Sequence, residues 1–375
     1  MRTAKSQTVA IIQEVVPHYR VGVFERLAKR LDGGLTMYSA DFAQPISGAD
    51  CVRCSSVGIG NVRLFPRPLI GAILRKHSTI ICEGRLGLLT CVLLAVLSRL
   101  SQTRVAWWTP LWRRNGRIEV GRGPRGWLMK YVLRSVSVVL TYGSRAAEVA
   151  AAVGIPSERV SVAYNSLDTP RLMREEQLWL SDPARLEAFA VSKDLSNKRI
   201  VLFVGQFIRR KRIDVLIDAF AALLARSTMR ELCLVMVGGG PEVSRMRKRV
   251  AAMGLGSAAR FEGEIVSINA ITPYFMHARV LVLPGTGGLV INQAMTHGVP
   301  VIVGGGDGTE ADSVVDGWNG YHWNGRDVED LSQKIEWIAC AEQPEWNRLS
   351  MAARSVVENK VNVDAMLDGI VKVLR

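Results

Sequence analysis

Residues 279–321, RVLVLPGTGGLVINQAMTHGVPVIVGGGDGTEADSVVDGWNGY, form the segment that decides the fold. The apolar run 280–283 has the length of one buried strand, and a Pro-Gly pair ends it. The apolar positions within 289–295 recur at helical spacing, and a Gly and a Pro stop that helix. A second apolar run, 299–303, is the next strand. The order strand, glycine turn, helix, strand predicts a parallel α/β unit.

The glycine-rich turn 285–288 has a direct chemical use. Glycine has no Cβ, tolerates positive φ and lets an anion approach the backbone. The first N–H groups of the following helix have no intrahelical partner and carry the positive end of the helix dipole. A helix start at the carboxyl end of a parallel strand is therefore a natural phosphate site. The alternative is that the glycines only make a tight turn.

The same segment resembles the nucleotide-sugar site of family 4 glycosyltransferases, enzymes of the GT-B fold. Their E-x7-E motif is followed by GGxxE and DGxNG, and here GTGGLVINQAM, HGVPVIVGGG, Glu310 and DGWNG match in that order. Gly285 and Gln293 stand where the family has two glutamates, of which the first contacts the transferred sugar and the second holds the ribose. The resemblance implies that Gln293 holds the ribose through its uncharged amide. It also implies donor binding by Thr286, Gly287, Gly288 and Leu289.

A second strand–turn–helix segment, 199–224, carries four consecutive cations, 209–212, at its tip. Cations at the carboxyl end of a strand suit a diphosphate, whereas a solvated charged face is the alternative. The segment resembles the family's G-R-L-x-x-x-K-G, whose Arg and Lys bind the donor diphosphate. Lys211 matches the Lys and Gln206 replaces the Arg. The resemblance assigns donor binding to Gly205, Gln206, Arg209, Arg210 and Lys211, with Arg210 and Lys211 on the diphosphate.

A third segment of this kind, 231–250, contains an apolar run followed by three glycines and a proline. Proline is favoured at the first position of a helix. The segment resembles the family's V-G-x-G-P, which lies next to the nucleotide, and this places Gly239 at the donor. Glu264 follows in a loop that lies near the nucleotide base in the family.

In the first half of the chain, two predicted strands end beside polar side chains. The strand 8–12 leads through Pro-His-Tyr-Arg into a helix and places His18 and Arg20 at the mouth of a sheet. The strand 78–84 contains Glu83 at its carboxyl end. We expect His18 and Glu83 to be catalytic or acceptor-binding residues. The alternatives are an ordinary helix-start residue and a salt-bridged loop carboxylate. The Pro-His-Tyr-Arg opening resembles that of a subset of family 4 enzymes.

The segment 104–134 has an unusual composition, with eight Lys and Arg, one acidic residue and four tryptophans. Indole rings favour the lipid headgroup zone, and basic residues are attracted to an anionic leaflet. The segment therefore predicts contact with an anionic membrane surface and with a lipid-diphosphate acceptor. The residues expected to make it are Trp107, Trp108, Trp112, Arg113, Arg114 and Arg117. The alternatives are a solvated loop with inward-packed tryptophans and a nucleic-acid patch.

Composition limits the remaining possibilities. The 375 residues fit two domains. The formal charge of +14 is uneven, because residues 1–195 contribute +12 and residues 196–375 contribute +2, so the first half is expected to face something anionic. The absence of an apolar stretch of the ~20 residues that span a bilayer, and of a convincing signal peptide, predicts a cytoplasmic protein at the inner face of the membrane. A lone Cys-x-x-Cys, 51–54, and scattered histidines predict no metal site.

These observations predict an α/β protein of GT-B architecture, with two Rossmann-like β/α/β domains facing each other across a cleft. Residues 1–166 are expected to bind the acceptor, 167–197 to connect the domains, and 198–357 to bind the nucleotide sugar. Residues 358–375 are expected to form a terminal helix that returns to the first domain.

The predicted function is transfer of a hexose from a nucleoside diphosphate sugar to a polyprenyl-diphosphate-linked or saccharide acceptor. Transfer is expected to retain the anomeric configuration, to need no metal or other cofactor, and to serve the synthesis of cell-envelope polysaccharide or glycolipid. One alternative is a sugar-nucleotide epimerase of the same fold, against which the loss of both motif glutamates argues. The other is a non-catalytic binder of anionic lipid or nucleic acid.

Overall fold

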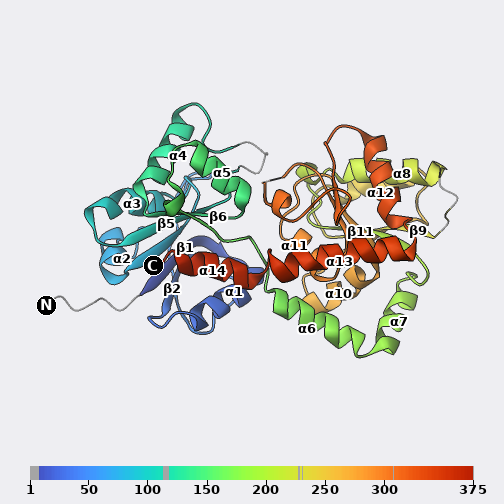
Figure 1. Ribbon diagram of the computed structural model, residues 1–375, viewed down its shortest axis with the longest axis horizontal. Coiled ribbons are helices and arrows are strands. Elements are labelled where there is room, and N and C mark those ends of the chain that lie inside the picture. The colour runs from blue at the N-terminus through green and yellow to red at the C-terminus, as the bar shows by residue number, and fades with distance from the viewer. Residues whose placement is uncertain (1–7, 113–117, 227–228, 230, 307, 375) are drawn as a thin grey trace. The chain divides into compact units, whose positions relative to one another are not determined.

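The computed structural model describes residues 8–112, 118–226, 229, 231–306 and 308–374 (Figure 1). By its internal contacts the chain divides into two compact units. Unit 1 comprises the described residues up to Asp168 together with the C-terminal segment from Val363, and unit 2 comprises those of Thr169–Asn362. Each unit contains a parallel sheet flanked by helices, so the predicted pair of Rossmann-like α/β domains is confirmed. The acceptor and donor roles assigned to the two halves stay predictions.

Unit 1 is built on a seven-stranded parallel sheet in the order β3-β2-β1-β4-β5-β6-β7. The central strands are short apolar runs buried on both faces, as a parallel sheet requires. The strands are β1 (Val9–Val16), β2 (Leu35–Phe42), β3 (Ala49–Arg53), β4 (Thr79–Glu83), β5 (Arg104–Thr109), β6 (Val138–Thr141) and β7 (Val160–Val162).

Two apolar cores lie on the two faces of this sheet, because successive strand residues point to opposite sides. Trp107 belongs to one core and Trp108 to the other. The first core is covered by α2 (Ile70–Lys76), α3 (Leu89–Leu97), α4 (Pro124–Ser135) and α5 (Ser144–Ala152). The second is covered by α1 (His18–Lys29) and α14 (Val363–Lys372) (Figure 1).

Helix α14 comes from the C-terminal end of the chain and packs on β7 and α1 of unit 1. The contact is close at Gly369, where a Cβ would lie 2.1 Å from the carbonyl oxygen of Val162. The Ser161 hydroxyl donates to the carbonyl oxygen of Gly369 at 2.8 Å. The chain terminus is therefore fixed to unit 1 by a packing contact that only glycine permits.

Unit 2 contains a six-stranded parallel sheet in the order β10-β9-β8-β11-β12-β13. Its strands are β8 (Arg199–Val204), β9 (Leu232–Val237), β10 (Ala259–Gly263), β11 (Ala278–Leu283), β12 (Val301–Val303) and β13 (Gly320–His322). Its helices are α6 (Thr169–Leu180), α7 (Pro183–Ser192), α8 (Ile213–Arg226), α9 (Val243–Ala252), α10 (Ile268–His277), α11 (Val290–Thr296), α12 (Val328–Ala339) and α13 (Gln343–Asn359).

A buried ion pair joins the first and last long helices of unit 2. The Arg354 guanidinium on α13 donates to both carboxylate oxygens of Glu176 on α6, at 2.9 and 2.7 Å. Burial alone would raise the pKa of Glu176, but the neighbouring His297 ring and Arg354 guanidinium outweigh it and lower the pKa to about 2. The His297 Nδ1 lies 3.6 Å from Glu176, which is long for a hydrogen bond, so Arg354 is the partner that holds this carboxylate ionised.

Candidate functional site

Three glycine turns meet at one edge of the unit 2 sheet, because β9, β8 and β11 are adjacent and parallel. The Phe207 N–H, after β8, donates to the carbonyl oxygen of Gly239, after β9, at 2.8 Å. A Cβ on Gly238 would lie 1.9 Å from the carbonyl oxygen of Gly205. Gly205 and Gly238 have φ of 155° and 144°, a conformation that side chains disfavour. At these glycines the edge therefore presents backbone rather than side chains.

Lys211 connects the turn after β8 to the turn after β11. It lies in the short 3-10 helix η3 (Arg209–Lys211) and is half-buried. Its ammonium donates to the carbonyl oxygens of Thr286 at 2.5 Å and Gly287 at 2.9 Å. Its Cε lies 3.7 Å from the position of a Cβ on Gly205. Four predicted donor residues thus lie together, and Lys211 positions the glycine turn as well as placing a positive charge beside it.

Gly285, which replaces the first motif glutamate, packs against the backbone of the cationic turn. A Cβ on Gly285 would lie 1.9 Å from the carbonyl oxygen of Arg210 and 2.7 Å from the Cα of Lys211. The Thr286 N–H donates to the same Arg210 oxygen at 3.4 Å. A glutamate would force the two turns apart, so the missing carboxylate is coupled to a closer approach of the cationic turn to the glycine turn.

The turn before α11 offers backbone donors. Within the part of the chain that the structure describes, the N–H groups of Gly287, Gly288 and Leu289 donate to no backbone carbonyl. Gly288 has a φ of 97°. Gln293 lies one turn further along and is half-buried. Consecutive N–H groups without partners form an anion-binding concavity, so the geometry fits the predicted diphosphate contact.

Glu310, the carboxylate of the GGxxE match, packs against the glycine turns. Its side chain is 4% exposed, and its Oε2 accepts a hydrogen bond from the Gly308 N–H at 3.1 Å. A Cβ added to Gly306 would lie 1.7 Å from Glu310 Oε1, and a Cβ added to Gly287 would lie 3.1 Å from the same oxygen. The carboxylate therefore occupies space that side chains at these glycines would need. The motif marked Glu310 in the sequence, but its contact with both turns could be found only from the fold.

The remaining predicted donor residues lie around this edge. The Glu264 Oε2 lies 3.5 Å from the position of a Cβ on Gly239, so these two residues are neighbours, and their contact with the donor stays a prediction. Gln206, Arg209 and Arg210 are exposed. The side chain of Arg209 is 91% exposed and its Nε lies 3.8 Å from the Glu242 carboxylate, so this cation reaches solvent at the edge of the sheet, as does Arg210.

The fourth cation of the turn, Arg212, is held inside unit 2 instead. Its guanidinium donates to the carbonyl oxygen of Gly325 at 2.5 Å and lies 4.7 Å from the centre of the Trp323 ring. Its φ of 53° lies in the left-handed region, which favours glycine. The family pattern has a glycine at this position. The run of four cations thus contains one that anchors the turn.

At the carboxyl edge of the unit 1 sheet, Glu83 belongs to an ionic network. Its Oε2 accepts a hydrogen bond from the Glu14 N–H at 2.7 Å, and its Oε1 lies 3.5 Å from Arg85 Nε. Arg85 also pairs with the Glu14 carboxylate, whose other oxygen lies 3.4 Å from Arg63. Glu83 is thus a salt-bridged carboxylate, which is the alternative to a catalytic or acceptor-binding role. His18 is exposed at the start of α1, and a catalytic role for His18 or Glu83 stays a prediction.

Arg20 follows the carboxyl end of β1, as expected, but the expectation that its side chain faces a cleft there is wrong, because it is buried. Arg20 is 6% exposed, donates to the carbonyl oxygen of Ser166 at 3.3 Å and pairs with Asn165. Burial lowers the pKa of Arg20, against the opposing effect of Tyr142 and Tyr19. The guanidinium ties α1 to the segment that closes unit 1, because helical spacing turns residue 20 inward.

The predicted membrane contact of Trp107 and Trp108 is also wrong. They are 0% and 2% exposed, because strand β5 is central in the sheet and both of its faces are covered. The alternative of inward-packed tryptophans holds for these two. Trp112 is half-buried, and Arg113, Arg114 and Arg117 lie outside the described residues. Trp127, on α4, is 66% exposed.

The thiols and histidines form no metal site in the described residues, where no cluster of three or more potential ligands occurs. Cys54, Cys82, Cys91 and Cys233 are buried, whereas Cys51 and Cys340 are half-buried. None of the described helices has the length and apolar composition needed to cross a membrane.

The fold and the glycine-lined edge define a GT-B-type protein. Residues 185–356, somewhat less than half of the chain, match the family described as "Glycosyl transferases group 1". This match confirms the resemblance to family 4 glycosyltransferases. Two solved structures share the fold: Anabaena Alr3699/HepE in complex with UDP (TM-score 0.75, 16% identity, 97% of this chain and 98% of that one) and a glycosyltransferase from Rickettsia africae (TM-score 0.75, 15% identity, 99% and 98%).

Curated relatives match over a shorter region. A D-inositol 3-phosphate glycosyltransferase of Frankia alni is 28% identical over 48% of this chain and 50% of its own length. A GDP-mannose-dependent α-(1-6)-phosphatidylinositol monomannoside mannosyltransferase of Mycolicibacterium smegmatis is 26% identical over 56% of this chain and 57% of its own. The chain thus spans about half the length of the curated relatives it matches.

Proposed function

We propose that this protein is a glycosyltransferase that transfers a sugar from a nucleoside diphosphate sugar to an acceptor. The observation that carries the proposal is the edge formed by the turns after β8, β9 and β11. There the amides of Gly287–Leu289, which donate to no backbone carbonyl among the described residues, lie beside the Lys211 ammonium. The family match of residues 185–356 and the names of the relatives support the same activity.

In this proposal the donor diphosphate lies between the cationic turn and the amides of Gly287–Leu289. Lys211 and Arg210 supply positive charge, and Gln293 holds the ribose with its amide. The diphosphate gains charge as it leaves, and fixed amides and cations aimed at it stabilise the transition state without reorganising. In this proposal the chain's own groups stabilise the leaving group and no metal ion takes part. The family resemblance supports transfer with retention of the anomeric configuration.

The acceptor is proposed to bind at the carboxyl edge of unit 1, near His18. Because Glu83 is held by a backbone N–H and lies beside Arg85, it is better placed to bind an acceptor hydroxyl than to take a proton. A lipid-linked or saccharide acceptor in cell-envelope synthesis is supported by the mannosyltransferase relative, whose name specifies a phosphatidylinositol glycolipid. The UDP and UDP-glucose complexes of Alr3699/HepE support a nucleotide sugar as donor.

Titration calorimetry with UDP, GDP, ADP and CMP tests this proposal. At least one nucleoside diphosphate should bind, and CMP, which lacks the second phosphate, should bind more weakly. Ligand at about 100 times its Kd adds roughly 2.7 kcal/mol to stability, so a thermal-shift assay gives a second readout. If no nucleoside diphosphate binds, the donor site is wrongly assigned. If one binds but its hexose conjugates release no sugar to any glycolipid or saccharide offered, the protein is a binder and not a transferase.

A further inference from the structure

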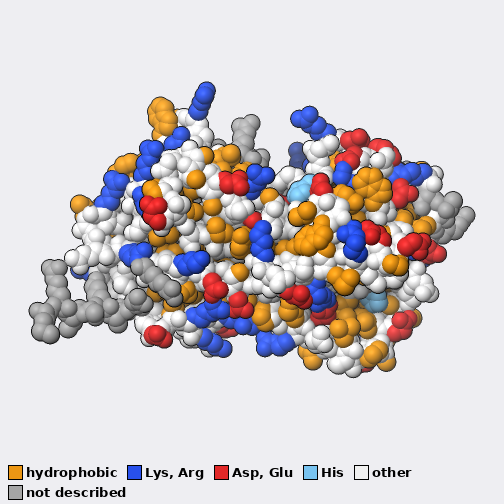
Figure 2. Space-filling model, viewed as in Figure 1, with side chains coloured by type: hydrophobic (Ala, Val, Ile, Leu, Met, Phe, Trp, Pro, Cys, Tyr) orange, Lys and Arg blue, Asp and Glu red, His pale blue; other side chains and the backbone are white. Residues whose placement is uncertain are grey.

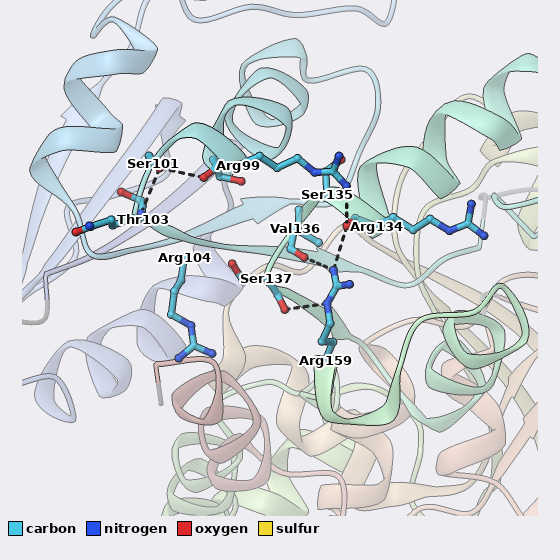
Figure 3. Close-up of a pocket in the computed structure, with 11 residues that line it drawn as sticks. Arg99, Ser101, Thr103, Arg104, Arg134, Ser135, Val136, Ser137 and Arg159 are labelled. Carbon is cyan, nitrogen blue, oxygen red and sulfur yellow. Dashed lines mark hydrogen bonds between the residues drawn. The ribbon is translucent and has the colours of Figure 1, made fainter.

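A pocket of about 410 Å³ opens at the amino edge of the unit 1 sheet (Figure 3). Arg104 is the first residue of β5, and Ser137 and Arg159 immediately precede β6 and β7. The rest of the lining comes from the end of α4 and from the segment between α3 and β5, which includes the 3-10 helix η1 (Ser98–Leu100). In parallel strands this edge is opposite to the one that carries Glu83, so the pocket is separate from the proposed acceptor site.

Four arginines and no acidic residue line this pocket: Arg99, Arg104, Arg134 and Arg159. Within the described residues, none of the four forms an ion pair with a carboxylate. Arg99 and Arg159 donate to the same carbonyl oxygen, that of Arg134, at 3.2 and 3.3 Å (Figure 3). Two guanidinium groups thus converge on one oxygen, and each has five N–H donors. Arg159 also donates to the carbonyl oxygens of Leu133, Val136 and Ser137. Within the described residues the Nη1 donors of Arg159 and the Nε and Nη1 donors of Arg99 therefore remain for an anion.

An apolar surface adjoins the pocket along α3 and α4. On α3 and η1 the exposed leucines recur on one helical face: Leu89 (39%), Leu93 (41%), Leu97 (38%) and Leu100 (87%). On α4, Trp127 is 66% exposed, Leu128 44% and Tyr131 47%. The two helices are in contact, and neither contains an acidic residue. Figure 2 shows hydrophobic and basic side chains interspersed over this part of unit 1.

One contact joins the apolar surface to the pocket. The Arg99 guanidinium lies 5.5 Å from the centre of the Tyr131 ring, within the range of a cation–π interaction. Arg134 follows Tyr131 by one helical turn, so aromatic and basic side chains lie in sequence along the same face of α4. Arg99 therefore links the exposed leucine face of α3 and η1 to the aromatic side chains of α4.

We propose that this α3–α4 surface docks on a bilayer that contains anionic phospholipid, with headgroup phosphates entering the four-arginine pocket. Exposed leucine and tryptophan side chains insert at the headgroup boundary. Arginine binds phosphate through two parallel hydrogen bonds, and cations beside an anionic leaflet each strengthen binding. Charge complementarity and the absence of carboxylates in the pocket and on both helices favour a phospholipid over a protein partner.

The docked surface extends from one edge of the unit 1 sheet to the other. Helix α3 starts at Leu89, a short turn after Glu83 at the end of β4, and η1 ends at Leu100 beside the pocket. A bilayer in contact with this helix therefore lies beside the edge at which an acceptor is proposed to bind. That position suits a lipid-linked acceptor, but the docking itself does not depend on glycosyl transfer.

Flotation of the full-length protein with vesicles tests the proposal. Vesicles of phosphatidylcholine with phosphatidylglycerol should bind the protein, more weakly as salt rises, whereas pure phosphatidylcholine should bind it poorly. R99Q/R104Q removes two pocket cations, which should weaken binding about thirtyfold. L100E changes the most exposed leucine and should reduce binding to a similar or greater extent. The matched control R171Q/R174Q removes two exposed cations from α6 of unit 2 and should bind like the wild type.

Three results would overturn the proposal: no binding to the phosphatidylglycerol vesicles at low salt, equal loss in the control variant, or unchanged binding of L100E. If inorganic phosphate binds and R99Q/R104Q abolishes that binding while vesicles do not bind, the pocket takes a free anion and the docking proposal fails. Nucleoside diphosphate affinity, measured without vesicles, should be the same in all variants, since the donor residues lie in unit 2. Loss of nucleoside diphosphate affinity in these variants would refute the donor assignment, and vesicle binding would still test the docking proposal independently.

Discussion

The two sheets of this protein use their carboxyl edges in different ways. In unit 2 the glycines in the turns after β8, β9 and β11 expose backbone, because close contacts or positive φ exclude side chains at these positions. In unit 1 the corresponding edge carries side chains, among them Glu83 and Arg85 in an ionic network. A backbone site serves a ligand group that is always present, such as a diphosphate. Side chains can vary with the acceptor, which explains why only the second half of the chain matches the family.

The largest expected effect concerns the tryptophans of unit 1. Trp107→Ala should lower the free energy of unfolding by about 4 kcal/mol, since it empties a fully buried site. Trp127→Ala, at an exposed position of α4, should change it by less than about 0.5 kcal/mol. Urea unfolding of both variants checks this. Similar values for the two would contradict the assignment of Trp107 to the core.

The next effect tests whether unit 2 depends on bare backbone. Gly285→Glu restores the family residue but places a Cβ 1.9 Å from the carbonyl oxygen of Arg210. It should destabilise the protein by about 3 kcal/mol and weaken nucleoside diphosphate binding. Gly256→Ala is the control, since nothing lies within 4 Å of its Cβ position. Tighter nucleoside diphosphate binding by Gly285→Glu would contradict this prediction, because it would show that the cationic turn 209–212 can move away from residue 285 without loss of the site.

The Glu176–Arg354 pair makes the stability of unit 2 dependent on pH. Because the folded pKa of Glu176, about 2, lies below the unfolded value of about 4.3, its contribution is fully present above pH 4.3 and is lost as the pH falls toward 2. Glu176→Gln should cost roughly 2–3 kcal/mol at pH 7 and flatten the stability curve below pH 5. Glu148→Gln, which breaks an exposed pair with Arg145, should cost less than about 0.5 kcal/mol. Urea unfolding of both variants and the wild type at several pH values measures these losses of stability.

Lys211→Ala should act on binding more than on stability. It removes one charge beside the diphosphate and two hydrogen bonds that position the glycine turn, so nucleoside diphosphate affinity should fall about tenfold to a hundredfold. Lys248→Ala, at an exposed position of α9, is the control and should leave affinity unchanged. Calorimetry compares the two, and equal affinities would remove Lys211 from the site.

The difference between the two edges also explains what could be predicted from sequence. Glycine spacing and apolar runs are local patterns, so the sequence itself predicts that Lys211, Thr286 and Gly287 share a site. The structure brings the Lys211 ammonium within hydrogen-bond distance of the carbonyl oxygens of Thr286 and Gly287, and their role in donor binding stays a prediction. The wrong predictions concern residues whose exposure depends on the direction of the side chain from its helix or on the place of its strand in the sheet. Arg20 and Trp107 lie in polar or basic segments, yet the phase of α1 and the central place of β5 turn them inward. The pocket of Arg99 and Arg159 joins residues sixty positions apart, and only the folded sheet brings them together.

Hydrogen–deuterium exchange across residues 285–291, with and without a saturating nucleoside diphosphate, tests the central claim most directly. The amides of Gly287, Gly288 and Leu289 donate to no backbone carbonyl in the described residues, so they should exchange quickly in the free protein and become strongly protected when the diphosphate accepts their hydrogen bonds. Binding that protects another part of the chain and leaves this segment exchanging at its free rate would contradict the account.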